Sequence, residues 1–273
     1  MHRPRLPAPA ACGVAAAGVL VCAAAAGAPL AGGAQQPPSG VPFAVGERLA
    51  YTARVARVGR VGRAAMWVEG PVDVRGTETY LLRFDFRARK GPVSARDTTA
   101  SWLDPQRMAA LRFQKHERHP LSDHDERVEL YPGERRWAGA GGAAGEGGES
   151  PTDAPLDELS FMYFVRTLAL APGTLYRFTR HYDAARNPTT VRVVRRDTVT
   201  TPAGVFPVVL LEMRVRDPRR YRGDGVIRLY LSDDARRLPV RIESRMPVIG
   251  TAVLTLDAYT AAPAAQRGAA GHF

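Results

Sequence analysis

The decisive stretch of the sequence runs Tyr80-Leu81-Leu82-Arg83-Phe84-Asp85-Phe86-Arg87. Its even-numbered residues are all apolar, whereas three of its four odd-numbered residues are charged. Because successive side chains of a β-strand point to opposite faces, this alternation predicts a strand with one face buried in a core. The same pattern returns over 227–231, 238–243 and 252–258. The chain is therefore predicted to be mainly β.

Other segments rich in alternating or β-branched residues extend this pattern along the chain. The turn Thr201-Pro202-Ala203-Gly204 separates two of them, with proline and glycine at positions that favour a reversal. Many short strands at this spacing predict an antiparallel meander that forms a barrel or a strongly curved sheet. The further predicted strands are 47–57, 63–70, 96–103, 108–117, 126–131, 174–182, 190–200 and 206–216.

One helix is predicted, over about 158–170. Asp157 is a suitable N-cap, Glu158 suits the first turn, and Pro172-Gly173 ends the helical pattern. Apolar residues cover nearly the whole circumference, which is typical of a buried helix. Such a helix can plug the hollow of the sheet, or it can act as an apolar lid over a lipid pocket.

The amino terminus resembles an export signal. Arg3 and Arg5 precede an uncharged Ala-, Val- and Leu-rich run, and Gly32-Gly33-Ala34 offers small residues for cleavage before Gln35. We therefore expect residues 1–34 to be a signal peptide and the mature protein to lie in the periplasm. An uncleaved membrane anchor is the alternative interpretation.

The two cysteines both fall inside this segment. Lipid anchoring at Cys22 is not expected, because the preceding Val21 is bulky, and Cys12 lies too early. The mature chain would then hold no disulfide, cysteine nucleophile or cysteine-based metal site. We expect no cofactor and no metal.

The remaining chain is predicted to form one domain. Residues 35–41 are a linker, 42–260 a single β-rich domain, 138–150 a flexible glycine-rich loop and 261–273 a disordered tail. Two domains divided at the glycine-rich loop are the alternative.

The chain is basic, with 38 Lys and Arg against 27 Asp and Glu and a formal charge of +11. This excess suits an anionic membrane surface, and an exported protein is not expected to meet nucleic acid. The basic residues are scattered, so most of them are expected to lie on solvated strand faces. The sequence gives no indication of the oligomeric state.

Five stretches together carry a family resemblance. They are 42–51, 97–104, 156–166, 199–206 and 229–240. In this order they resemble a bacterial exported family, the domain of unknown function numbered 3108. The resemblance implies an envelope protein of β-rich fold, and it supplies no catalytic residues.

A histidine- and carboxylate-rich segment is the strongest candidate for chemistry. It contains His116, His119 and His124 together with Asp123, Asp125 and Glu126. If the segment is a strand, residues 116 and 119 point to opposite faces, which argues against a shared metal ion. A solvated hairpin tip is the preferred interpretation, and a metal-dependent hydrolase using the three histidines is the alternative.

Two other acidic sites are expected to be structural. Asp233-Asp234 is predicted to form a turn, and Glu47 to pair with an arginine.

These observations favour a non-catalytic envelope protein that binds an apolar or amphiphilic ligand, such as a lipid or another envelope component, in the hollow of the sheet. We do not expect an enzyme. A hollow packed solid by Phe84, Phe86, Phe161 and Leu168 would instead indicate a structural or interaction module. The candidate ligand contacts are Phe84, Phe86, Trp102, Phe161 and Phe164.

Overall fold

A computed structural model describes residues 40–120, 122–140, 146–218, 224–246 and 250–261. These residues all belong to one unit of the chain. The predicted signal peptide, both cysteines, most of the linker and nearly all of the predicted tail lie outside the described residues.

The described chain forms a 14-stranded sheet in which every strand pairs antiparallel with its neighbours, in the order β8-β7-β6-β5-β4-β3-β2-β1-β14-β13-β12-β11-β10-β9. The sheet is an open meander with β8 and β9 at its edges, so the predicted mainly β fold is confirmed. The first eight strands are β1 (Arg48–Val55), β2 (Gly59–Val74), β3 (Thr77–Lys90), β4 (Val93–Asp104), β5 (Ala109–His119), β6 (Ser122–Tyr131), β7 (Arg136–Gly139) and β8 (Gly147–Glu149). The others are β9 (Leu175–Phe178), β10 (Thr189–Thr201), β11 (Gly204–Arg216), β12 (Asp224–Ser232), β13 (Pro239–Met246) and β14 (Gly250–Thr260).

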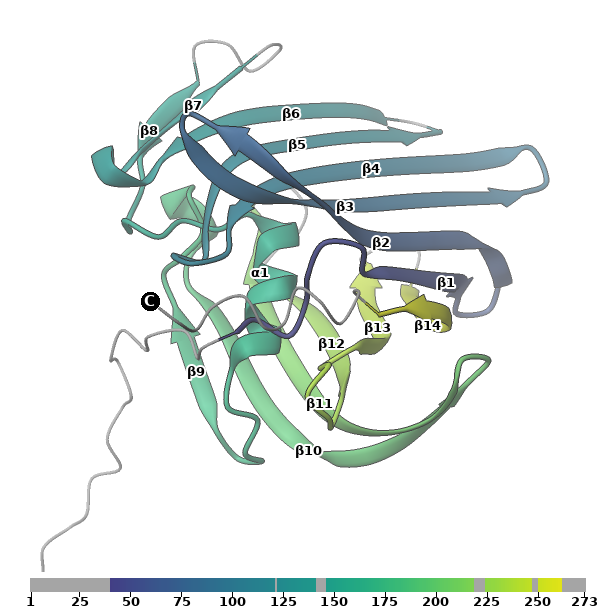
Figure 1. Cartoon of the computed structure of the whole chain (residues 1–273). Coiled ribbons are helices and arrows are strands. Elements are labelled where there is room, and N and C mark those ends of the chain that lie inside the picture. The colour runs from purple at the N-terminus through teal and green to yellow at the C-terminus, as the bar shows by residue number, and fades with distance from the viewer. Residues whose placement is uncertain (1–39, 121, 141–145, 219–223, 247–249, 262–273) are drawn as a thin grey trace, which may run out of the picture. The chain divides into compact units, whose positions relative to one another are not determined.

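The sheet bends so that β1 to β8, the first wall, face β9 to β14, the second wall (Figure 1). The walls are continuous through the pairing of β1 with β14. Helix α1 (Glu158–Phe164) lies in the hollow between them (Figure 1). We call the face of the sheet turned toward α1 the inner face; it carries Leu49, Leu82 and Leu229, which are completely buried.

The decisive stretch forms the middle of β3. Leu82 is buried on the inner face, and Phe84 and Phe86 are partly buried there against the same apolar cluster. Leu81, on the other face, is also buried, where its cross-strand partner is Trp102. The outer face of β3 is therefore less solvated than the alternation predicts.

Helix α1 begins where the sequence predicts and ends earlier. The Asp157 carboxylate accepts hydrogen bonds from the backbone N–H groups of Leu159 and Ser160, 2.9 Å each, in a capping box. After Phe164 the chain tightens into a 3₁₀ turn, η3 (Val165–Thr167), and Leu168 is already extended. The prediction of a helix to residue 170 is wrong because this turn ends the helical hydrogen bonding before the proline is reached.

The predicted flexible loop over 138–150 is partly wrong. Its two ends belong to β7 and β8, which pair with each other, and only 141–145 lie outside the described residues. A side chain at Gly148 would come within 3.2 Å of the Trp137 indole. Glycine here permits close packing between the strands.

The two structural predictions for acidic residues hold. Glu47 forms a buried ion pair with Arg166, at 2.7 Å. Asp233 and Asp234 lie in the turn between β12 and β13, where the Asp234 carboxylate accepts from the Arg236 backbone N–H at 2.9 Å. Among the described residues, no helix combines the length and apolar character needed to cross a membrane.

Candidate functional site

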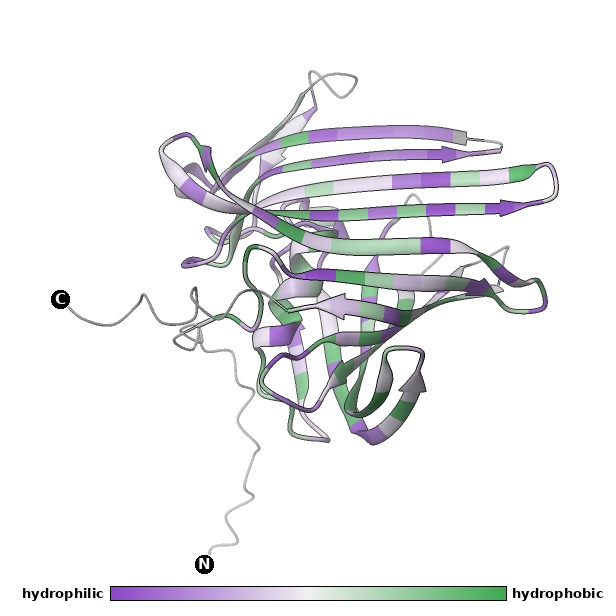
Figure 2. Cartoon of the chain, turned by 45° about the vertical axis from the view of Figure 1, so that its right-hand side comes forward, coloured by the Kyte–Doolittle hydropathy of each residue, from purple (hydrophilic) through white to green (hydrophobic). Residues whose placement is uncertain are grey.

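The inner face of the first wall changes from apolar to polar at β4. Strand register places two rows of polar side chains on this face, and the strands β5 and β6 are coloured mainly hydrophilic in Figure 2. One row is Asp97, Glu117 and His124, and the other is Thr99, Lys115 and Glu126. Lys115, Glu117 and Glu126 are each less than a tenth exposed. Buried charges of this kind require partners inside the hollow.

Lys115 links the first wall to α1. Its ammonium group donates to the Glu158 carboxylate and lies 3.2 Å from Glu117 Oε1. Arg186, in the short 3₁₀ turn η4 (Ala184–Arg186), lies 3.5 Å from Glu158 and 3.7 Å from Glu126. Glu158 therefore bridges two buried cations at the amino end of α1.

Two aromatic side chains before η4 complete this polar cluster. The Tyr182 hydroxyl donates to the Glu126 carboxylate, and burial together with that carboxylate raises the Tyr182 pKa. Burial and the nearby Arg186 guanidinium lower the pKa of His181, so His181 is neutral at physiological pH. The connection between β9 and β10 of the second wall is thus joined, through Tyr182, to β6 of the first wall.

Asp157 is fully buried beneath this cluster. Besides capping α1, its carboxylate accepts from the Ser101 hydroxyl at 2.6 Å. Burial raises the Asp157 pKa to about 6, although these hydrogen bonds act in the opposite direction.

A cavity of about 210 Å³ opens beside the amino end of α1. Its lining is divided by chemistry. Apolar side chains come from α1, β11 and β12, and charged side chains come from the α1 amino end, η4 and the end of β11. The apolar group includes Phe161, Met162, Met213, Val215 and Ile227, and the charged group is Asp157, Glu158, Arg186, Arg216 and Asp217.

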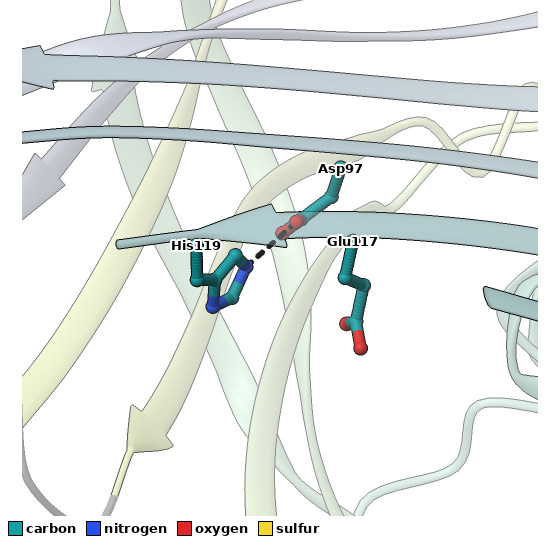
Figure 3. A group of neighbouring side chains, drawn as sticks. All are labelled: Asp97, Glu117 and His119. Atoms are coloured by element: carbon teal, nitrogen blue, oxygen red, sulfur yellow. Dashed lines mark hydrogen bonds and ion pairs between the residues drawn. The ribbon is translucent and has the colours of Figure 1, made fainter. Parts of the chain in front are cut away.

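A smaller cluster lies further along β4 and β5. His119 Nε2 is 2.7 Å from Asp97 Oδ1, and Glu117 lies on the same face of β5 as His119 (Figure 3). One potential ligand atom from each of the three side chains lies within 4.8 Å of the other two. Glu117 and Asp97 are largely buried, whereas the His119 side chain is 36% exposed.

The model of the family described as "Protein of unknown function (DUF3108)" matches residues 50–257. The chain belongs to the DUF3108 family. The part of the chain that the family model matches contains all of the strands from β2 to β13 and most of β1 and β14. A search of curated proteins found no match.

One solved structure supports the fold of this DUF3108 chain. A beta-barrel-like protein of domain of unknown function DUF1849 from Brucella abortus matches with a TM-score of 0.58 and 13% identity, over 81% of this chain and 99% of that one. Two others cover 81% of this chain: one described as an exported protein with a YmcC-like fold from Bacteroides fragilis (TM-score 0.30, 12% identity, 98% of its chain), and one described as a lipoprotein from Parabacteroides distasonis (TM-score 0.31, 11%, 97%). At these identities the likeness to the Brucella protein shows the fold alone.

The predicted ligand contacts are only partly brought together. Phe161 lines the cavity and packs against Phe164, with ring centroids 5.7 Å apart. Phe84 and Phe86 lie on the inner face of β3, while Trp102 points to the outer face, where the Arg112 guanidinium stacks 5.4 Å from its ring. Trp102 therefore does not face the hollow.

The histidine-rich segment is divided as the strand pattern predicts. His116 lies on the outer face, 2.9 Å from Asp125, whose pKa is lowered by Arg118 and His116. His119 and His124 lie on the inner face, and His124 is 3.5 Å from Glu126. The three histidines of the hydrolase alternative do not converge on one point.

Sequence reasoning missed the charged cluster of Lys115, Glu117, Glu158 and Arg186. The only available signal was a polar residue at every second position of 115–119. It was hidden because the alternate positions, such as Gln114 and Arg118, are polar too. Asp97 was also missed as a neighbour of His119, since their contact depends on strand pairing between β4 and β5.

Proposed function

We propose that this DUF3108 protein is a non-catalytic protein of the bacterial cell envelope that binds an amphiphilic ligand in the hollow of its sheet. The cavity beside α1 is the single observation that carries the proposal. It is apolar along Phe161, Met162 and Ile227 and charged at Glu158 and Arg186. A ligand with an apolar end and a polar end matches this division.

The size of the cavity limits how the ligand is held. Its volume of about 210 Å³ lies below the range of about 300–1,000 Å³ typical of pockets that enclose a small molecule. We infer that one short apolar portion of the ligand enters, and that the remainder lies along the polar inner face toward Lys115 and Glu117. The partly buried rings of Phe84 and Phe86 offer further apolar contact on β3.

The predicted signal peptide supports the envelope location. Residues 1–34 have the charged start, apolar run and small-residue end of an exported chain. The basic excess of the whole chain also suits an encounter with an anionic membrane surface.

The experiment is a binding measurement with variants that fill the cavity. Ile227→Trp and Ser244→Phe place large side chains in its lining, and Val205→Trp, at an exposed position of β11, is the control. The probe is anilinonaphthalene sulfonate, a fluorescent amphiphile, and lipids extracted from protein purified from its native host are analysed by mass spectrometry. We expect the two cavity variants to lose probe binding and the co-purified lipid, while the control retains both.

Retention of probe and lipid by folded Ile227→Trp and Ser244→Phe would refute the proposal, as would the absence of both from the unmodified protein. That second result would favour a structural or interaction module, which the buried Phe161 and Leu168 also support. A pull-down from envelope extracts with Arg195→Ser and Arg196→Ser then tests whether a partner docks on the exposed arginines of β10.

A further inference from the structure

Three side chains on adjacent strands provide the donor set of a metal centre. Asp97 comes from β4, and Glu117 and His119 come from alternate positions of β5, so strand pairing alone fixes them on one face (Figure 3). We propose that Asp97, Glu117 and His119 bind one divalent transition-metal ion, with Zn²⁺ as the representative ion. The proposal is independent of the amphiphile and revises the sequence-based expectation that the chain binds no metal.

The donor chemistry fits this class of ion. Imidazole nitrogen and carboxylate oxygen are both zinc ligands, and one imidazole with two carboxylates leaves a fourth tetrahedral position open. With metal–ligand bonds of about 2.0–2.1 Å, neighbouring ligand atoms in a tetrahedron are about 3.3 Å apart. The contact between Asp97 and His119 is 2.7 Å, and the whole set fits within 4.8 Å. Side-chain rotations that move the ligand atoms by about an ångström therefore suffice to admit the ion.

The existing hydrogen bond shows what the ion would displace. His119 Nε2 and Asp97 Oδ1, two of the proposed ligand atoms, already face each other at 2.7 Å. A metal ion that takes both atoms as ligands replaces this hydrogen bond, with His119 bound through Nε2 as a neutral imidazole.

The electrostatics of the inner face also favour a cation. Near the site, the described inner face and α1 present the carboxylates of Asp97, Glu117, Glu126 and Glu158 against the cations Lys115 and Arg186. The hollow is thus locally acidic in a chain whose formal charge is +11. Lys115, 3.2 Å from Glu117 Oε1, is placed to orient this carboxylate from outside the coordination shell.

The site is accessible from solvent, and His124 lies close enough to be a candidate fourth ligand. The His119 side chain is 36% exposed at the end of β5, which provides an entry path. His124 is the direct cross-strand partner of Glu117 on β6, and its side chain lies on the same face. His124 or water can occupy the open position.

The experiment is isothermal titration of the full chain with zinc chloride, together with Co²⁺ absorption spectroscopy to report coordination geometry. We expect one ion per chain and a tetrahedral Co²⁺ spectrum. Asp97→Asn, Glu117→Gln and His119→Ala should each weaken binding by about tenfold or more. His124→Ala should have a smaller effect.

His116→Ala is the matched control, because His116 lies on the same strand but on the outer face, beside Asp125. It should bind metal like the unmodified chain. Circular dichroism confirms that each variant is folded, and Asp97→Asn and Glu117→Gln preserve side-chain shape. Failure of the unmodified chain to bind stoichiometric metal would overturn the proposal, as would equal loss in His116→Ala and His119→Ala. Neither outcome affects the amphiphile proposal, which is read out by probe and lipid.

Discussion

At the scale of single residues, Arg166 places a full charge inside the apolar core. Its side chain is 1% exposed, and its guanidinium donates to both Glu47 oxygens, at 2.7 and 2.8 Å, and to the Pro42 and Arg236 carbonyls, at 3.0 Å each. These contacts tie the segment before β1 to η3 and to the turn before β13. The ion pair thus fixes three separate parts of the chain against one another.

Arg166→Met is expected to lower the free energy of unfolding by about 3–5 kcal/mol, because it leaves the Glu47 carboxylate buried without its cation. The double variant Glu47→Gln with Arg166→Met should lose less than the sum of the two single losses. Urea denaturation followed by circular dichroism measures both quantities. A single Arg166→Met variant as stable as the parent would contradict the structural role assigned here.

Asp157 gives a pH-dependent prediction. Burial raises its pKa in the folded protein from an ordinary 3.8 to about 6, so between these pH values the folded state holds more proton than the unfolded state. This group therefore makes the free energy of unfolding fall as the pH rises from about 4 to 6. Asp157→Asn keeps an N-cap acceptor without the charge and should remove that fall.

The measurement is urea denaturation of both proteins at a series of pH values. The stability of Asp157→Asn relative to the parent should increase across this window and stay level above it. A constant difference between the two proteins at every pH would contradict the raised pKa.

At the scale of elements, the sequence predicts strands well where one face is apolar and poorly where both faces are polar. In β3 the apolar residues at every second position identify the inner face directly, and the structure agrees at Leu82. In β5 both faces carry charged residues, so the sequence identifies the strand but not which charges are buried. Lys115 and Glu117 become internal only because β5 pairs with β4 and β6 and faces α1.

Element boundaries depend on contacts that the sequence alone does not display. The N-cap of α1 was predictable because Asp157 caps the backbone N–H groups of Leu159 and Ser160, which follow it closely in the sequence. The end of α1 was not, since Val165, Leu168 and Leu170 continue the apolar pattern while the backbone leaves the helix. Likewise, the hairpin of β7 and β8 is hidden within a glycine-rich stretch that resembles a loop.

Gly62 tests the close pairing of β2 with β3. A Cβ at this position would lie 1.9 Å from the Arg87 carbonyl oxygen, a backbone atom that cannot move without disturbing the ladder. Gly62→Ala should lower the free energy of unfolding by about 1–3 kcal/mol, as overpacking does elsewhere. Gly133→Ala is the control, because a Cβ at Gly133 meets nothing within 4 Å. Thermal denaturation compares the stabilities of the two variants. An equal loss of stability in both would show that the backbone at Gly62 can shift to accommodate a Cβ without cost.

At the scale of the whole molecule, the fourteen described strands form one uninterrupted sheet, and buried contacts also cross the hollow. The apolar cluster contains residues of both walls, including Leu82 and Leu229. The Tyr182–Glu126 hydrogen bond adds a polar link between them. A single cooperative unit is expected from this continuity, in preference to two domains divided at the glycine-rich loop.

The tryptophans allow a direct test, since Trp67, Trp102 and Trp137 all lie in the first wall. Far-ultraviolet circular dichroism reports on both walls, whereas tryptophan fluorescence reports on the first alone. The two urea transitions should coincide, with the same midpoint and slope. Separate midpoints would show that the walls unfold as independent domains.

The pairing of β1 with β14 has a consequence for how the protein is made. Of the fourteen described strands, the first and the last to leave the ribosome are neighbours at the centre of the sheet. A nascent chain lacking its final segment leaves β1 and β13 as unpaired strand edges. The ladder between them cannot close during synthesis, and the contact spans about 200 residues, which makes for slow folding. Closure of the central ladder is therefore expected to follow, and not to precede, synthesis of β14.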